Sequence, residues 1–200
     1  MKKHILLLGI SLSIILFTLS AASYPGGSQN DINAIGYDWK HNYLCNLLNE
    51  KAVNGADNAA RIWAIGGMFC LCMSIALFFV RFSDKIPAIN SAKIIKYCGI
   101  VSMFFGFLVF TPYHNLMTTL SSIAALVALF YMTIYIFKSK RPVFKGLSVL
   151  CLAILYVNNY IYYSQHLLEI LPILQKISFL LVFALILGLD YFTKKEDFLP

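Results

Sequence analysis

Charged residues are scarce in this chain of 200 residues, and acidic residues are the scarcest. Only 12% of the residues are charged, with nine Asp and Glu against sixteen Lys and Arg. Soluble domains carry about 25% charged residues, whereas here 60% of the residues are hydrophobic and the mean hydropathy is +0.74. The composition therefore excludes an ordinary soluble domain and predicts a single integral membrane domain over residues 1–200.

The motifs of common catalytic and cofactor sites are also missing. The chain contains no HExxH pair, no paired-cysteine spacing, no glycine-rich phosphate loop and no GxSxG element. Four of the five cysteines fall in apolar runs, and Cys45, outside them, is expected as a free thiol rather than an intermolecular one. The sequence therefore predicts no cofactor, and it leaves open whether the protein is an enzyme.

Long apolar runs dominate what is present. Each is close to the ~20 residues that a helix needs to cross about 30 Å of hydrocarbon, and none shows the alternation of membrane-spanning strands. The sequence predicts an all-α bundle of six transmembrane helices, over residues 5–22, 60–82, 94–113, 117–137, 144–163 and 168–192. Gly66 and Gly67, in the second run, predict close packing against another helix.

The distribution of Lys and Arg between the runs predicts the orientation. One side of the membrane would carry Lys2, Lys3, Arg81, Lys85, Lys93, Lys96, Lys138, Lys140, Arg141, Lys145, Lys194 and Lys195. The other side would carry only Lys40, Lys51 and Arg61. Because basic residues concentrate in cytoplasmic loops, we expect a multi-pass protein of the cell membrane, with both termini cytoplasmic and residues 23–59 outside. The basic residues form no continuous stripe, so membrane lipids are the expected partners and nucleic acid is not; no protein partner is indicated.

The N-terminal run has an alternative interpretation. Lys2 and Lys3, the apolar residues 5–19 and the small residues 20–23 also resemble a secretory signal peptide with a cleavage site. We prefer a retained helix, because the run is long for a signal peptide and an even number of helices fits the charge distribution. Cleavage would leave five helices and an outward N-terminus.

Residues 23–59 form the one long connection. Pro25, Gly26 and Gly27 predict a turn at the membrane surface. A short interfacial amphipathic helix is predicted to follow, with Asp38 as its N-cap. Trp39 and Tyr43 would anchor this helix at headgroup depth. Its apolar face would hold Trp39, Tyr43, Leu44, Leu47 and Leu48, and its polar face Asp38, His41, Asn42, Cys45, Asn46 and Asn49.

Polar residues gather on the predicted outer side. Three of the four histidines, His41, His114 and His166, map there. With Asp38, Asp57 or Glu169 they are candidate ligands for zinc, although their spacing matches no zinc motif. Hydrogen bonding to loops or headgroups is the plainer alternative. Asn158 lies inside an apolar run, where a polar side chain faces the bundle interior, either to bind a ligand or to bond to another helix.

Lys176 is the most informative single residue. It lies fourteen residues before Asp190, which puts it about 9 Å below the outer boundary of a ~30 Å core. Ionisable residues at such depth tend to face the interior and pair with another group. Glu169, two turns earlier, is the predicted partner, and extension of the lysine to the outer headgroups is the alternative.

One segment carries a family resemblance. NYLCNLL, followed by NGADNAARIWAIGGMFC, resembles a family of six-span bacterial membrane proteins of unknown function, which is similar in layout to the DRAM and Sfk group of eukaryotic membrane proteins. That family has a Ser/Asp-Leu-Gly element after its first helix and an Asn before its second. Asn46-Leu47 and Asn58 are the matching positions here, with Asn46 at the Ser/Asp position and Leu48 in place of the glycine, so the motif match is partial. The resemblance implies six helices and no catalytic residues.

The sequence therefore leaves three functional hypotheses. The first is an outward-facing pocket of His41, His114, Asn158, His166, Glu169 and Lys176 that binds a lipid headgroup or another amphipathic ligand. The second is a lipid hydrolase or transferase that uses His114 or His166 as a base, or zinc held by His41, His114 and His166. The third is a structural or partner-binding subunit in which the polar groups hold the helices together.

Overall fold

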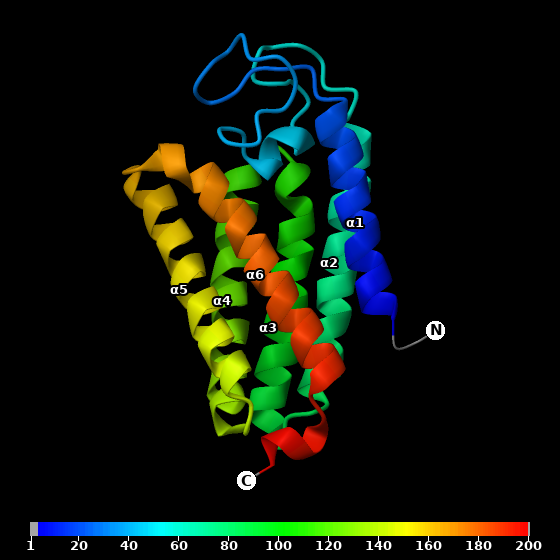
Figure 1. Cartoon of the computed structure of the whole chain (residues 1–200), viewed down its shortest axis with the longest axis vertical. Helices are drawn as coiled ribbons and strands as arrows, with labels where there is room; N and C mark the ends of the chain where they lie inside the picture. Colours follow the sequence, from blue (N-terminus) through cyan, green and yellow to red (C-terminus); the bar gives the residue numbers. More distant parts are fainter. Residues whose placement is uncertain (1–3, 200) are drawn as a thin grey trace.

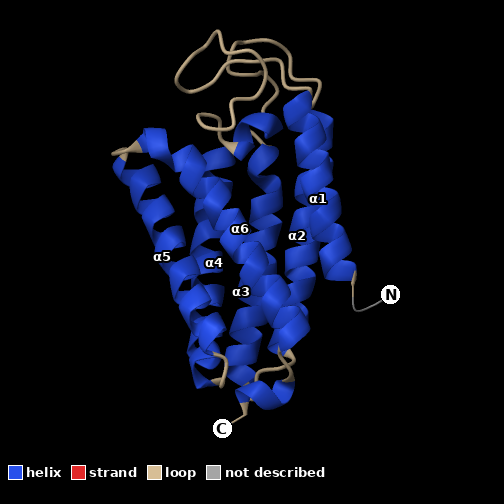
Figure 2. Ribbon diagram, in the orientation of Figure 1, coloured by secondary structure: helices blue, strands red, loops and turns tan. Residues whose placement is uncertain are grey.

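The computed structural model describes residues 4–199, which form six long helices (Figures 1 and 2). They are α1 (Ile5–Ala22), α2 (Arg61–Ser83), α3 (Ile89–Phe107), α4 (His114–Lys138), α5 (Pro142–Ser164) and α6 (Leu171–Phe192). Each is long and apolar enough to cross a membrane, alone or with an adjoining short turn. The prediction of an all-α, six-helix, multi-pass architecture is confirmed, and residues 4–199 contain only two isolated β-bridges and no named strand.

The third helix departs most from its predicted bounds. It begins at Ile89 and not at residue 94, because Ala88 after Pro87 is extended and starts the helix as its N-cap. It ends at Phe107, where a short 3₁₀ turn over Leu108–Phe110 leads to the next helix. Backbone hydrogen bonds continue through polar residues, so the helix is longer at its start than the apolar run.

Five of the helices form a ring. Contacts run from α2 to α3, α4, α5 and α6 in order, and α6 returns to α2, while α1 packs on the outside of α2 (Figure 1). Gly67 allows this last contact, because a Cβ there would lie 3.2 Å from the Ser13 carbonyl oxygen. The predicted close packing at this glycine is confirmed. Large apolar side chains such as Leu8, Phe104 and Phe130 stay exposed on the bundle, as lipid contact requires.

The end of the bundle that carries both chain termini, called here the terminal end, is fastened by polar contacts. Arg81 of α2 lies 3.3 Å from Asp190 of α6, and Lys85 Nζ donates to the Leu189 and Thr193 carbonyl oxygens at 2.9 and 3.0 Å. Burial lowers the pKa of Lys85. These contacts close the ring between α2 and α6, and Lys2 and Lys3 lie outside the described residues.

The other end is covered by residues 23–60, called here the cap (Figure 1). Gly26 pairs with Ile35 and Lys51 with Asp57 in the two isolated bridges. Gly27 adopts a φ of +80°, and a Cβ there would lie 2.4 Å from the backbone nitrogen of Asn54. A glycine is therefore required where the backbone at residue 27 passes close to the backbone at Asn54.

The predicted amphipathic helix over residues 38–49 is not confirmed. Asp38 accepts hydrogen bonds from the backbone nitrogens of Lys40 and His41 in a single turn, the chain is extended at Tyr43, and only Leu44–Leu48 forms a 3₁₀ helix. Asn46 Oδ1 accepts from the Tyr43 backbone nitrogen at 2.7 Å. Asn side chains that bond to nearby backbone in this way compete with helix formation.

Candidate functional site

A cavity of about 550 Å³ lies inside the ring of helices. Side chains of α2 to α6 line its walls, and cap residues Tyr43, Cys45, Asn46 and Asn49 line its covered end. The volume is within the 300–1,000 Å³ typical of small-molecule sites. The ring and the cap therefore line a partly open space large enough for a ligand.

The polarity of α4 changes along the cavity. From the cap end, its lining residues are His114, Asn115, Thr118, Ser121, Ser122, Ala125, Leu126, Leu129 and Met132. The spacing keeps them on one helical face, and the polar residues stop at Ser122. Met132 lies eighteen residues after His114, so this wall spans about 27 Å at 1.5 Å per residue.

Helices α5 and α6 show a similar gradient below the cap. On α5, Tyr162, Asn159 and Asn158 are nearer the cap and Leu155 is deeper. On α6, Leu171 lies nearest the cap, Gln175 and Ser178 follow, and Phe179, Val182, Leu185 and Ile186 are deeper. On α2, the lining residues Ile75 and Phe79 lie near the terminal end. The cavity is therefore polar at the cap end and apolar at the terminal end.

Most polar groups of the lining are satisfied by one another. Ser102 and Ser121 each donate to the other's carbonyl oxygen, at 3.0 and 2.9 Å. Tyr162 donates to Asn115 Oδ1 at 2.8 Å. Asn158 Nδ2 donates to Ser178 Oγ at 2.5 Å. These bonds join α3 to α4, α4 to α5 and α5 to α6, so the cap end of the ring is held by hydrogen bonds.

Two buried oxygens of the lining residues have no hydrogen-bond partner in residues 4–199. They are Thr118 Oγ1 on α4 and Asn158 Oδ1 on α5. Thr118 is four residues from the start of α4 and Asn158 six residues from the end of α5, or about 6 and 9 Å below the cap end. Buried polar atoms without partners are rare in native structures, and each calls for an explanation.

The lining contains no Asp, Glu, Lys or Arg among residues 4–199. His114, whose Nδ1 lies 3.2 Å from Asn115 Oδ1, is its one histidine. Cys45 contributes a thiol, and burial raises the pKa of that thiol. The cavity lining therefore offers a ligand hydrogen bonds and apolar surface, but no charged Asp, Glu, Lys or Arg side chain among residues 4–199.

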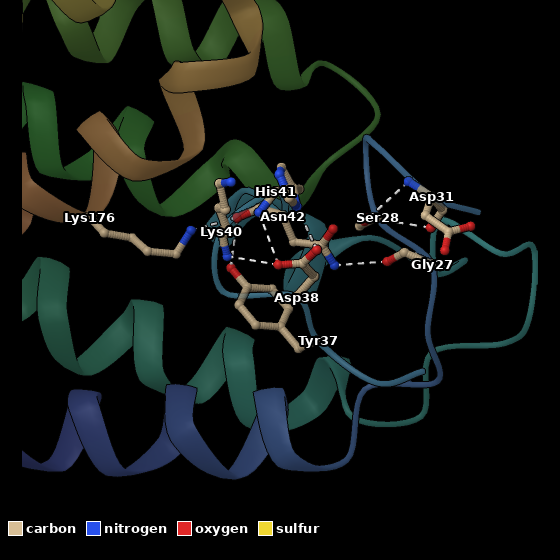
Figure 3. A network of polar contacts seen from close by, with 9 residues as sticks. All are labelled: Gly27, Ser28, Asp31, Tyr37, Asp38, Lys40, His41, Asn42 and Lys176. Atoms are coloured by element: carbon tan, nitrogen blue, oxygen red, sulfur yellow. Dashed lines mark hydrogen bonds and ion pairs between the residues drawn. The ribbon is translucent and has the colours of Figure 1, made fainter. Parts of the chain in front are cut away.

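Two of the six predicted ligand-binding residues, His114 and Asn158, line the cavity. His41 lies in the cap, with its Nδ1 2.6 Å from Asp38 Oδ2, a hydrogen bond that lowers the pKa of the Asp38 carboxyl (Figure 3). His166 and Glu169 are exposed at the turn between α5 and α6. His41, His114 and His166 do not come together, and residues 4–199 contain no group of three His, Cys, Asp or Glu that could hold a metal ion.

Lys176 is not among the residues that line the cavity, and its side chain points toward Asn42 and Tyr37 of the cap (Figure 3). Its Nζ donates to the Asn42 carbonyl oxygen at 2.6 Å and to the Pro172 carbonyl oxygen at 3.0 Å, and it lies 5.7 Å from the centre of the Tyr37 ring. These carbonyl groups, rather than the expected Glu169, are its partners. Tyr37 donates to the same Asn42 oxygen at 3.1 Å, and burial raises the pKa of Tyr37 far above its usual value.

Three further contacts join the cap to α6 and to the turn before it. Leu44 donates its backbone N–H to Gln175 Oε1 at 2.9 Å, and the Gln175 amide nitrogen lies 3.7 Å from Cys45 Sγ. Tyr43, one of the two predicted interfacial anchors, donates to the Leu168 carbonyl oxygen at 3.4 Å, while the other, Trp39, is exposed and packs edge-on against Tyr37. The cap is thus attached to the same helix that lines one wall of the cavity.

The sequence did not predict that Gln175 and a polar stripe of α4 line a cavity. The signal for the stripe was present, because Thr118, Ser121 and Ser122 interrupt an apolar run at helical spacing. Small hydroxyl residues also serve as packing positions in membrane helices, so the pattern alone does not predict a cavity.

No protein family matches the chain, and no curated protein and no solved structure matches it either. The resemblance to six-span bacterial membrane proteins therefore stays a prediction. The two asparagines on which the resemblance depends, Asn46 and Asn58, both bond to backbone groups of the cap. Asn46 holds the backbone of Tyr43, and Asn58 Nδ2 donates to the Leu47 and Asn49 carbonyl oxygens at 3.1 and 3.0 Å.

Proposed function

We propose that this protein binds an amphipathic ligand in the cavity of the helix ring, with the polar group of the ligand near the cap and its apolar part toward the terminal end. The observation that carries the proposal is the polarity gradient shared by α4, α5 and α6. His114 and Asn158 contact the polar group of the ligand, and Leu129 and Met132 contact its apolar part. The α4 wall is about 27 Å long, and its apolar part from Ala125 to Met132 spans about 10 Å of it. A space of this shape suits an amphipathic molecule with one hydrocarbon chain, such as a single-chain lipid.

The cap closes the polar end of the site. Tyr43 and Asn46 form part of the lining, and the bonds of Lys176 and Gln175 to cap backbone fix the position of these residues. In this proposal Lys176 orders the cap and does not contact the ligand. Its buried charge is thereby compensated by two carbonyl groups.

We also propose that the cap lies outside the cell and that both termini are cytoplasmic. This orientation is supported by the basic residues outside the helix interiors, because Arg81, Lys140 and Lys194 belong to the terminal end and Lys40, Lys51 and Arg61 to the cap end. Lys176, near the cap end of α6, lies inside a predicted transmembrane helix and is not counted. A membrane-impermeant maleimide, added to intact cells, should label a protein with Asn30→Cys in a cysteine-free background and should not label one with Lys140→Cys. The opposite pattern would reverse the orientation.

The binding proposal is tested by filling the cavity. Ala125 lines it at mid-depth on α4, whereas Ala153 is exposed on α5 and does not line it. Ala125→Phe and Ala153→Phe add the same volume at these two positions. Saturable binding of a panel of single-chain lipids (monooleoylglycerol, oleoyl lysophosphatidate and methyl oleate) is measured on purified protein by native mass spectrometry.

We expect at least one member of the panel to bind with one-to-one saturation, and Ala125→Phe to weaken that binding at least tenfold while Ala153→Phe leaves it unchanged. A phenyl ring in the cavity would occupy the volume that the hydrocarbon chain needs. If no lipid of the panel shows binding that depends on residue 125, the proposed function is wrong.

A further inference from the structure

The lining of the cavity also restricts which amphipathic ligands fit it. We infer that the ligand has an uncharged polar group with at least one hydroxyl or amide hydrogen, which bonds to Asn158 Oδ1 and Thr118 Oγ1. The inference rests on the proposed function, because it names the chemical class of the ligand for the same cavity. It depends on two observations, the unpartnered oxygens and the absence of charge from the lining.

The hydrogen bonds around Asn158 define which of its side-chain atoms is free. Ser178 donates its hydroxyl hydrogen to the Leu174 carbonyl oxygen at 2.7 Å. Ser178 Oγ can therefore only accept from Asn158, so the atom of Asn158 that meets it at 2.5 Å is the amide nitrogen. The oxygen Oδ1 remains buried without a donor. The partner that satisfies it must bring a hydrogen, as a hydroxyl or an N–H group does.

Thr118 is unlike the threonine beside it. The Thr119 hydroxyl bonds back to the Asn115 carbonyl oxygen at 2.8 Å and contacts the Tyr163 hydroxyl at 2.7 Å. The Thr118 hydroxyl has neither kind of bond, although it is buried and its residue lines the cavity. A hydroxyl can donate or accept, so Thr118 suits a ligand hydroxyl in either role.

The absence of Lys and Arg from the cavity lining disfavours the binding of anionic lipids. A phosphate or carboxylate taken from water into this cavity would lose its hydration, and no lysine or arginine among residues 4–199 lines the cavity to compensate. Lys176, on the α6 wall, directs its ammonium group to the Asn42 and Pro172 carbonyl oxygens. Gln175, the residue of α6 that does line the polar end, is neutral.

The inference is tested with the three lipids already named, since they share an oleoyl chain. Monooleoylglycerol carries two hydroxyls and no charge, oleoyl lysophosphatidate adds a phosphate to the same glycerol, and methyl oleate has no hydrogen to donate. Dissociation constants are compared as mole fractions in one detergent. We expect monooleoylglycerol to bind at least tenfold more tightly than either of the others.

Thr118→Val and Thr119→Val provide a matched pair of variants, because valine replaces the hydroxyl with a methyl group of similar size. Loss of one hydrogen bond to the ligand should weaken monooleoylglycerol binding by about five- to tenfold in Thr118→Val and should leave methyl oleate unchanged. Thr118→Val should also raise the melting temperature of the empty protein, since it removes an unsatisfied buried group. Thr119→Val should lower the melting temperature and leave both affinities unchanged.

Two results would overturn the inference. One is lysophosphatidate or methyl oleate binding as tightly as monooleoylglycerol, and the other is Thr118→Val weakening methyl oleate as much as monooleoylglycerol. If either occurs while Ala125→Phe still abolishes binding, the cavity binds amphipathic ligands but does not select them by hydroxyl groups. If Ala125→Phe has no effect on any of the three, the proposed function itself fails.

Discussion

At the scale of single residues, Lys176 illustrates how an apolar helix accommodates a charge. Its ammonium group lies within hydrogen-bond distance of two carbonyl oxygens and near the face of the Tyr37 ring. Hydrogen bonds to a charged donor contribute about 1.5–3 kcal/mol each, although desolvation of the lysine opposes this gain. The net effect is a tie between the cap and α6 rather than a charge presented to a ligand.

Lys176→Met should therefore loosen the cap. Methionine keeps the length and apolar contacts of the side chain but cannot donate to Asn42. We expect amide hydrogen exchange to become faster over residues 37–48, while α4 is unaffected. Lys93→Met is the control, because Lys93 is exposed on α3 and has no ion pair among residues 4–199. Unchanged exchange over residues 37–48 in Lys176→Met would show that this tie does not hold the cap.

The sequence predicted some of these residue environments and missed others. Asn158 was expected to face the bundle interior, and it does, because a polar group in an apolar run must find a partner inside the protein. The partner of Lys176 in the cap was not predictable, since it is the Asn42 carbonyl group, 134 residues away in sequence. Patterns of side chains carry no information on where distant backbone oxygens lie.

At the scale of elements, the transmembrane helices and the cap differ in how they are encoded. Six apolar runs were sufficient to predict six helices, because in hydrocarbon the backbone N–H and C=O groups can bond only to one another. In the cap, backbone groups can also bond to polar side chains. Asn42, Asn46 and Asn58 bond to backbone groups of the cap, and these bonds replace the helix that the spacing of apolar residues had predicted.

The contact between α2 and α3 provides an element-scale prediction. Phe79 of α2 lines the cavity and packs on Gly99 of α3, where a Cβ would lie 2.1 Å from the ring. Gly99→Ala should displace this ring and lower the free energy of unfolding by about 1–3 kcal/mol. Thermal unfolding of the purified protein measures the effect.

The control is the same substitution on an open helix surface. Nothing lies within 4 Å of the position of a Cβ at Gly146 in α5. Gly146→Ala should raise stability by up to about 1 kcal/mol, because alanine has the higher helix propensity. Equal effects of Gly99→Ala and Gly146→Ala would mean that the close approach of α2 and α3 is not important for stability.

At the scale of the whole molecule, the ring of α2 to α6 creates the site. No single helix contains it, since the lining comes from five helices and the cap. The sequence did not specify helix order, and so the convergence of the α4 stripe with Asn158 could not be predicted. Polar contacts keep α6 beside its neighbours at the two ends of the ring. Asn158 of α5 bonds to Ser178 near the cap end, and Arg81 of α2 pairs with Asp190 near the terminal end.

The orientation of the bound ligand tests the central claim most directly. The measurement uses two photoreactive analogues of monooleoylglycerol. One carries a diazirine beside the glycerol, and the other carries it at the end of the chain. Each is cross-linked to the purified protein, and peptide mass spectrometry identifies the labelled residues. The account predicts that the first labels α4 within residues 114–122 and the second labels α4 within residues 126–132 or α6 within residues 182–186. Labelling of the same residues by both analogues, or of lipid-facing residues such as Phe104 and Phe130, would contradict it.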